Sequence, residues 1–92
     1  MMTAAQARQA TLEKINQIAK EFIINNVGQA VYEATIEGEF HTKVPFDGVP
    51  NLKQTGAEVV KLLQEQGYEA EHSYYDGPNG YANYICIKWE DA

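Results

Sequence analysis

The stretch 68-YEAEHSYYDGPNGYANYICIKW-89 predicts a β-hairpin, because two runs with strand-like alternation flank a cluster of turn-forming residues. If Gly77-Pro78-Asn79-Gly80 is the loop, Asp76 lies opposite Tyr81. In that register one face is largely apolar, and the other places a glutamate opposite a lysine. A slip by one residue would bury two carboxylates without partners, so the four-residue loop is favoured. The remaining pairs are Tyr68 with Trp89, Ala70 with Ile87, His72 with Ile85, Glu69 with Lys88, Glu71 with Cys86, and Ser73 with Tyr84.

A strand and a helix precede the hairpin. Residues 40–46 alternate between apolar and polar side chains, which is strand spacing. Pro45 predicts an edge position for this strand, because proline cannot donate a hydrogen bond to a ladder. Asn51 then caps a helix over residues 52–66, and Gly67 ends it. The inward-facing residues of this helix are Leu52, Val59, Leu62 and Leu63.

Gly56 is an unusual residue for the interior of that helix. Glycine costs about 1 kcal/mol relative to alanine at such a position. Its missing Cβ is useful where another part of the chain packs closely. We therefore expect a close contact between Gly56 and another backbone.

The N-terminal residues predict a long helix over residues 4–24. Thr3 and Gln6 match the capping-box pattern at its start. An apolar stripe follows at helical spacing. Residues 4–10 are only Ala, Gln and Arg, so the first two turns either project from the body or pack on a partner. The stripe consists of Leu12, Ile15, Ile18, Ala19, Phe22 and Ile23.

A second helix is expected after a break at Asn25-Asn26. Asn26 is a good N-cap residue, and Gly38 supplies the left-handed conformation that commonly ends a helix. The inner face of this helix consists of Val27, Ala30, Val31 and Ala34.

The predicted order is helix, helix, strand, helix, strand, strand. With 92 residues the chain has room for one hydrophobic core. We therefore expect a single α+β domain over residues 1–92, with a three-stranded antiparallel sheet packed on one face by helices.

The charge balance argues against one class of partner. The chain has a net charge of −6, and its only arginine is Arg8. Nucleic-acid binding depends on Lys and Arg side chains that neutralise phosphates, so we do not expect nucleic acid as a partner. The acidic clusters contain Glu33, Glu37, Glu39, Glu69, Glu71 and Asp76.

The sequence also predicts a cytoplasmic location without a membrane partner. No apolar run approaches the ~18 residues that span a bilayer. The N-terminus lacks the basic and apolar regions of a signal peptide. Cys86 is the single cysteine and cannot form an internal disulfide, so nothing indicates an oxidising compartment.

Residues able to carry catalysis are few and isolated. His41 and His72 lie on different strands, without the spacing of a metal site. Cys86 lies mid-strand opposite Glu71, where nothing stabilises a thiolate. The glycine-containing loop 77–80 has no following helix that could bind phosphate. We expect no catalytic residue, no metal site and no cofactor.

The tip of the hairpin is rich in tyrosine, which combines a large apolar ring with a hydrogen-bonding hydroxyl and suits recognition surfaces. The alternative is that these rings pack across the strands on the open face of the sheet. The candidate partner-binding residues are Tyr74, Tyr75, Asp76, Asn79, Tyr81 and Tyr84.

Three segments, 31-VYEATIEGEF-40, 62-LLQEQGY-68 and 85-ICIKW-89, resemble small accessory proteins of tailed bacteriophages. In those proteins a helix ending in glycine precedes a strand, a leucine-rich helix ends in Gly-Tyr, and an Ile-x-Trp strand closes the chain. The resemblance implies a compact non-enzymatic protein that sits in virions or binds a host or defence component. It carries over no active-site residue.

The sequence thus predicts an acidic, non-enzymatic binding protein of phage origin. It is expected to occupy a surface of a host or phage protein in the host cytoplasm and to form a homo-oligomer. Two alternatives stay open. One is a sequestering protein with a small-molecule pocket between subunits, and the other is a structural component of the virion.

Overall fold

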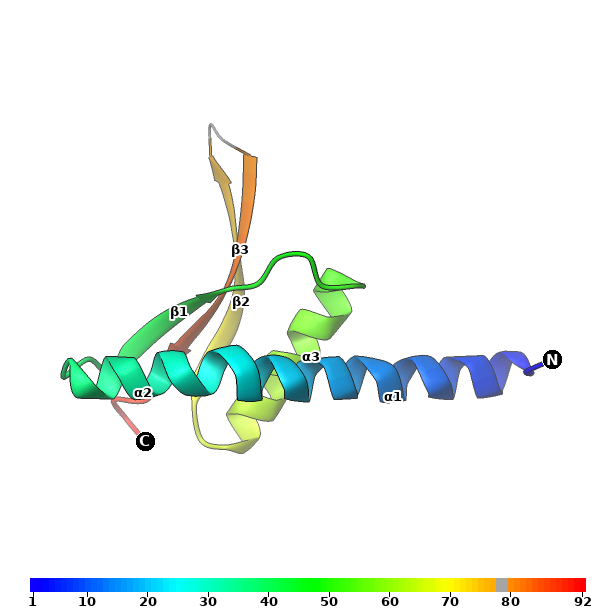
Figure 1. The fold of residues 1–92 in the computed structure, drawn as a ribbon, viewed down its shortest axis with the longest axis horizontal. Helices are drawn as coiled ribbons and strands as arrows, with labels where there is room; N and C mark the ends of the chain where they lie inside the picture. Colours follow the sequence, from blue (N-terminus) through cyan, green and yellow to red (C-terminus); the bar gives the residue numbers. More distant parts are fainter. Residues whose placement is uncertain (78–79) are drawn as a thin grey trace.

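The computed structural model describes the backbone of residues 1–77 and 80–92, and the side chains of residues 1–73 and 83–92. Figure 1 shows a long helix running past a shorter helix and a three-stranded sheet. The helices pack on one face of the sheet, which confirms the predicted α+β class. In chain order the elements are α1 (Ala4–Phe22), the π-helical turn η1 (Ile23–Val27), α2 (Gly28–Ile36), β1 (His41–Pro45), α3 (Leu52–Glu65), β2 (Glu69–Gly77) and β3 (Gly80–Lys88).

The sheet has the strand order β1–β3–β2, and both neighbouring pairs are antiparallel. The predicted hairpin register is confirmed from Glu69 opposite Lys88 to Asp76 opposite Tyr81. Beyond the strand ends, the rings of Tyr68 and Trp89 meet edge to face with their centroids 6.0 Å apart. The predicted four-residue loop is too long, because Gly77 and Gly80 pair with each other at the ends of β2 and β3. Residues 78 and 79 lie outside the described residues.

β1 pairs with β3 alone, so it is an edge strand, as Pro45 predicts. It is slightly shorter than the predicted 40–46. Phe40 still extends the ladder, because its carbonyl accepts a hydrogen bond from the Trp89 N–H at 3.0 Å. The Phe40 side chain, however, is 52% exposed and adds little to the core.

α1, η1 and α2 form one uninterrupted helical run over residues 4–36, so the predicted break at Asn25-Asn26 is wrong (Figure 1). Gly28 N–H donates to the Ile23 carbonyl, five residues back, which defines a π turn in place of a cap. Asparagine disfavours a helix interior by only about 0.7 kcal/mol. Burial of the adjacent Val27, which is 1% exposed, outweighs that preference. The predicted inner residues are buried or half-buried: Val27, Ala30, Val31 and Ala34.

The start of α1 carries the predicted capping box. Thr3 Oγ1 accepts from the Gln6 N–H at 3.2 Å, and Gln6 Oε1 accepts from the Thr3 N–H at 2.9 Å. Residues 1–11 are exposed throughout, and Figure 1 shows the N-terminal part of α1 extending past the other elements. Ile15 is the first buried residue along the helix.

We expect Thr3→Ala to fray the first turn of α1 without weakening the fold as a whole. Loss of an N-cap costs about 1 kcal/mol locally. Amide hydrogen exchange at Gln6 and Ala7, whose N–H groups donate to the Thr3 side chain and carbonyl, should therefore become roughly fivefold faster. The thermal unfolding midpoint should stay the same, because residues 1–11 are not part of the core.

Thr11→Ala is the control for this variant. The Thr11 hydroxyl donates to the Ala7 carbonyl within the same exposed helical turns, but it caps no helix end. Thr11→Ala should leave the exchange of the Gln6 and Ala7 amides unchanged. A lower midpoint for Thr3→Ala would show that the N-terminal turns do support the core.

α3 begins at Leu52 as predicted, but the side chain of Asn51 does not cap it. Asn51 adopts a left-handed conformation with φ of 50°, and its Nδ2 donates to Gln54 Oε1 at 2.9 Å. The Asn51 carbonyl accepts the first helical hydrogen bond, from the Thr55 N–H at 2.9 Å. Gly67, with φ of 92°, ends the helix as predicted.

Gly56 lies against the imidazole of His72 in β2, so the predicted contact with another backbone is wrong. A Cβ on Gly56 would overlap His72 Nδ1 and would lie 2.8 Å from Cε1. The missing side chain therefore allows α3 to pack closely on the sheet.

The core lies between the sheet and the helices that cover one of its faces. Phe46, which follows β1, is fully buried. Its ring meets Phe22 of α1 edge to face at 4.8 Å and His72 of β2 at 5.3 Å. This aromatic group therefore joins α1 to the sheet. The buried cluster consists of Ala19, Val27, Val44, Phe46, Val59, Leu63, Ile85 and Ile87.

Candidate functional site

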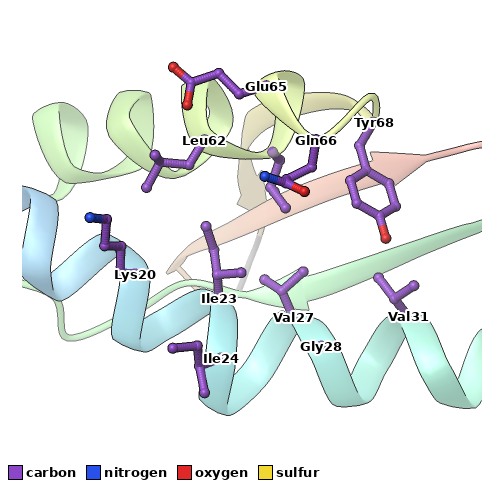
Figure 2. A pocket seen from close by; sticks show the side chains of 11 residues that line it. Lys20, Ile23, Ile24, Val27, Gly28, Val31, Leu62, Glu65, Gln66 and Tyr68 are labelled. Atoms are coloured by element: carbon purple, nitrogen blue, oxygen red, sulfur yellow. The ribbon is translucent and has the colours of Figure 1, made fainter.

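A groove with a volume of about 540 Å³ lies between the long helix and the C-terminal part of α3 (Figure 2). This volume falls within the range of about 300–1,000 Å³ that is typical of ligand sites. Most of the lining is aliphatic. The aliphatic lining residues are Ile23, Ile24, Val27, Val31, Leu62 and Leu63.

The π turn shapes one wall of the groove. It fits an extra residue into the helical turn, and the adjacent Ile23 and Ile24 both line the groove. Figure 2 shows Ile23 and Val27 pointing toward α3, while Leu62 points back from α3 toward α1. Ile24 lies at the opening and is 75% exposed. Single π turns occur frequently at functional sites, which favours this segment as a binding element.

Polar groups stand at the rim of the groove. Lys20 contributes an ammonium group from α1, and Glu65 and Gln66 contribute polar side chains from the end of α3. The carbonyl end of a helix carries partial negative charge, so the α3 side attracts cations and the Lys20 side attracts anions. Figure 2 shows the Tyr68 ring closing the α2 end, with its hydroxyl directed toward the long helix.

More apolar side chains lie exposed further along α2. Tyr32 is 65% exposed and Ile36 is 67% exposed. Four residues separate them, so they lie on the same side of the helix. They do not line the groove, but they extend the exposed apolar surface of the long helix beyond it.

The tyrosine-rich tip can be placed only in part. The backbones of Tyr74, Tyr75, Asp76 and Tyr81 belong to the β2–β3 ladder. Their side chains, and all of Asn79, lie outside the described residues. Tyr84 is half-buried opposite Ser73 and Pro45, and Lys43 Nζ lies 5.9 Å from its ring centroid. The proposed binding role of this tip stays a prediction.

The histidines and the cysteine do not line the groove. His41 is exposed at the edge of the sheet, with its Nε2 3.5 Å from Glu39 Oε2. His72 packs edge-on against Phe46 under α3. Cys86 is half-buried, with Glu71 opposite it in β2 and Lys43 opposite it in β1. Within the described residues, no three His, Cys, Asp or Glu side chains come together in a way that could hold a metal ion.

The sequence patterns do not reveal the groove. They place five of its lining residues on inward helix faces: Ile23, Val27, Val31, Leu62 and Leu63. One signal was present, since Ile23 and Ile24 are adjacent and a single helical stripe cannot bury both. The predicted break after Ile24 hid this signal, because a helix end can turn either residue inward.

Comparison with known proteins gives no match, whether to a protein-family model, to a curated protein or to a solved structure. In the described parts of the chain, none of the helices combines the length and the apolar character needed to cross a membrane. The function must therefore be inferred from the chemistry of the groove and of the exposed surfaces.

Proposed function

We propose that this chain is a non-enzymatic protein-binding domain that holds an amphipathic helix of a partner in the groove between its long helix and α3. The groove is the observation that carries the proposal, because it exposes aliphatic side chains from two helices at one place. Helix-in-groove binding is a recurring mode of peptide recognition, and it uses apolar anchors at helical spacing.

A helix fits this site better than an extended segment does. An extended segment gains most of its affinity from a free sheet edge, whereas here both walls are helical and offer side chains. Ridges of a third helix can pack between the rows of side chains that the two helices present. The charged rim residues fix the direction of the partner helix, because Lys20 attracts an acidic residue of the partner and Glu65 attracts a basic one.

A small apolar molecule is the second candidate ligand. The volume of the groove and its aliphatic lining suit such a molecule. This differs from the pocket between subunits expected from the sequence, because a single chain forms the groove. The phage origin, the homo-oligomer and the virion role stay predictions from the sequence alone.

Photo-crosslinking from position 24 tests the protein-binding proposal. A benzoylphenylalanine placed at Ile24 lies at the mouth of the groove, and one placed at Tyr32 lies on the same helix outside it. In the producing cell we expect position 24 to capture one partner segment whose apolar residues recur at helical spacing. A synthetic peptide of that segment should then bind the purified chain.

We expect Ile24→Glu to weaken the binding of that peptide by about tenfold or more. The substitution removes an aliphatic anchor worth roughly 1.5–3 kcal/mol when buried and places a carboxylate in an apolar contact. Isothermal titration calorimetry measures the change. The fold should tolerate the variant, because Ile24 is largely exposed.

Tyr32→Glu is the matched control, since it places the same charge on an exposed apolar residue outside the groove. An equal loss of peptide affinity in both variants would show that the partner binds the exposed face of α2, which would contradict the groove proposal. A co-purifying small molecule that native mass spectrometry detects, and that Ile24→Glu removes, would favour the second candidate.

A further inference from the structure

β2 forms one edge of the three-stranded sheet. The sheet order β1–β3–β2 places β2 at one side, and no described strand pairs with its outer edge. β2 is nine residues long, and its register with β3 runs from Glu69 to Gly77 without a bulge. Proteins usually protect such an edge with proline, a bulge, a short strand or charged side chains, above all lysine. β2 contains neither proline nor lysine, and its charged residues are the acidic Glu69, Glu71 and Asp76.

Two hydrogen bonds show which backbone groups of β2 face outward. Phe46 N–H donates to the Asn83 carbonyl at 2.8 Å, and Trp89 N–H donates to the Phe40 carbonyl at 3.0 Å. Odd-numbered residues of β3 therefore direct their backbone groups toward β1, and even-numbered ones direct theirs toward β2. The even-numbered residues of β3 pair with odd-numbered residues of β2.

The even-numbered positions of β2 consequently point away from β3, because backbone groups alternate in direction along a strand. Ala70, Tyr74 and Asp76 thus offer N–H and C=O groups along the outer edge. α3 contacts β2 on the inner face of the sheet, where Gly56 lies against His72.

The surface beside this edge is acidic. Glu69 and Glu71 are exposed, and both occupy positions on the face of the sheet away from α3. Lys88 lies opposite Glu69, but Glu71 faces the neutral Cys86. Glu90 and Asp91, also exposed, follow β3 and line a hollow with Glu69, which His41 and Lys88 also line.

The opposite edge of the sheet is less suited to strand addition. β1 is only five residues long and ends in Pro45, which has no N–H to donate. α2 also packs beside β1. The two edges therefore differ in length and in hydrogen-bonding capacity, and only β2 offers a long regular template.

We propose that the free edge of β2 binds an extended protein segment as a fourth strand, and that this segment carries Lys or Arg at alternate positions. Its backbone pairs with the outward groups of Ala70, Tyr74 and Asp76. Its basic side chains lie on the outer face beside Glu69 and Glu71, where opposite charges on neighbouring strands attract. This surface is distinct from the groove, and the proposal does not depend on a partner helix there.

The test uses amide hydrogen exchange of the isotope-labelled full chain with a blocked peptide of sequence Lys-Thr-Lys-Val-Lys-Thr. At saturating peptide we expect the amides of Ala70, Tyr74 and Asp76 to exchange about tenfold more slowly. The amides of Glu69, Glu71 and Ser73 should change little, because they already bond to β3. This alternation is a signature that non-specific attraction to an acidic surface would not produce.

The double variant Glu69→Gln with Glu71→Gln should weaken binding of the peptide by roughly tenfold at low salt. Glu13→Gln with Glu21→Gln is the matched control, because it removes the same charge from the exposed surface of α1 and should leave binding unchanged. The groove variant Ile24→Glu should not affect it either.

Three results would overturn the proposal. The first is no added protection at the three amides, and the second is equal protection by the peptide Glu-Thr-Glu-Val-Glu-Thr. The third is protection that appears without peptide and rises with protein concentration, which would assign the edge to a second copy of this chain.

Discussion

Replacing Phe46 with alanine is expected to lower the free energy of unfolding by about 3–5 kcal/mol. The Phe46 ring is fully buried, and it meets Phe22 at 4.8 Å and His72 at 5.3 Å. Alanine would remove the ring that joins the long helix to the sheet, and the neighbouring rings cannot fill the space without leaving their own contacts. A domain of this size has about 5–10 kcal/mol of total stability, so the variant should be close to unfolding at 37 °C.

Chemical denaturation followed by circular dichroism measures this change. Phe40→Ala is the matched control, because Phe40 flanks the other end of β1 and is 52% exposed. We expect a loss of less than about 1 kcal/mol for that control. Comparable losses in the two variants would show that Phe46 is not the central contact between helix and sheet.

The hairpin could be predicted from the sequence because two independent patterns agree there. Alternation places Ile85 and Ile87 on one face, and both are fully buried in the structure. The carboxylates of Glu69 and Glu71 exclude the neighbouring register, because burying them unpaired would cost several kcal/mol. A local pattern decides the structure when the competing arrangement carries a cost of that size.

The long helix was predicted less well because the competing preferences are small. Asn25 and Asn26 disfavour a helix interior by about 0.7 kcal/mol each. Packing of Val27 and Ala34 on the rest of the fold is a tertiary effect that reverses this preference, and no local pattern reveals its magnitude. The side-chain cap predicted for α3 is wrong for the same reason. Asn51 starts the helix with its backbone carbonyl and adopts a left-handed φ.

The groove could not be predicted, because its walls come from segments about forty residues apart. Sequence periodicity shows which residues face inward, but it does not show whether two apolar faces close fully against each other. Here Leu62 and Val31 are half-buried, so the contact between the long helix and α3 is incomplete at this end. The free edge of β2 likewise became visible only with the strand order.

Gly56→Ala is expected to destabilise the fold by about 2 kcal/mol. The added methyl group would overlap His72 Nδ1 and lie 2.8 Å from Cε1. The imidazole also contacts the Phe46 ring, so a shift away from the methyl group would disturb that contact. Overpacking of this kind costs about 1–3 kcal/mol, and it outweighs the gain of up to about 1 kcal/mol from better helix propensity.

Gly28→Ala measures the gain in helix propensity without the cost of overpacking. A Cβ at Gly28 would meet only the Ile23 carbonyl, at an ordinary 3.6 Å. That variant should gain about 0.5–1 kcal/mol, because the backbone is already helical there. The decisive measurement is Gly56→Ala in a His72→Ala background, where the overlap is gone and the alanine should become neutral or stabilising. If Gly56→Ala costs the same with and without His72, the close approach of α3 to β2 through this pair is wrong, and the glycine serves another contact.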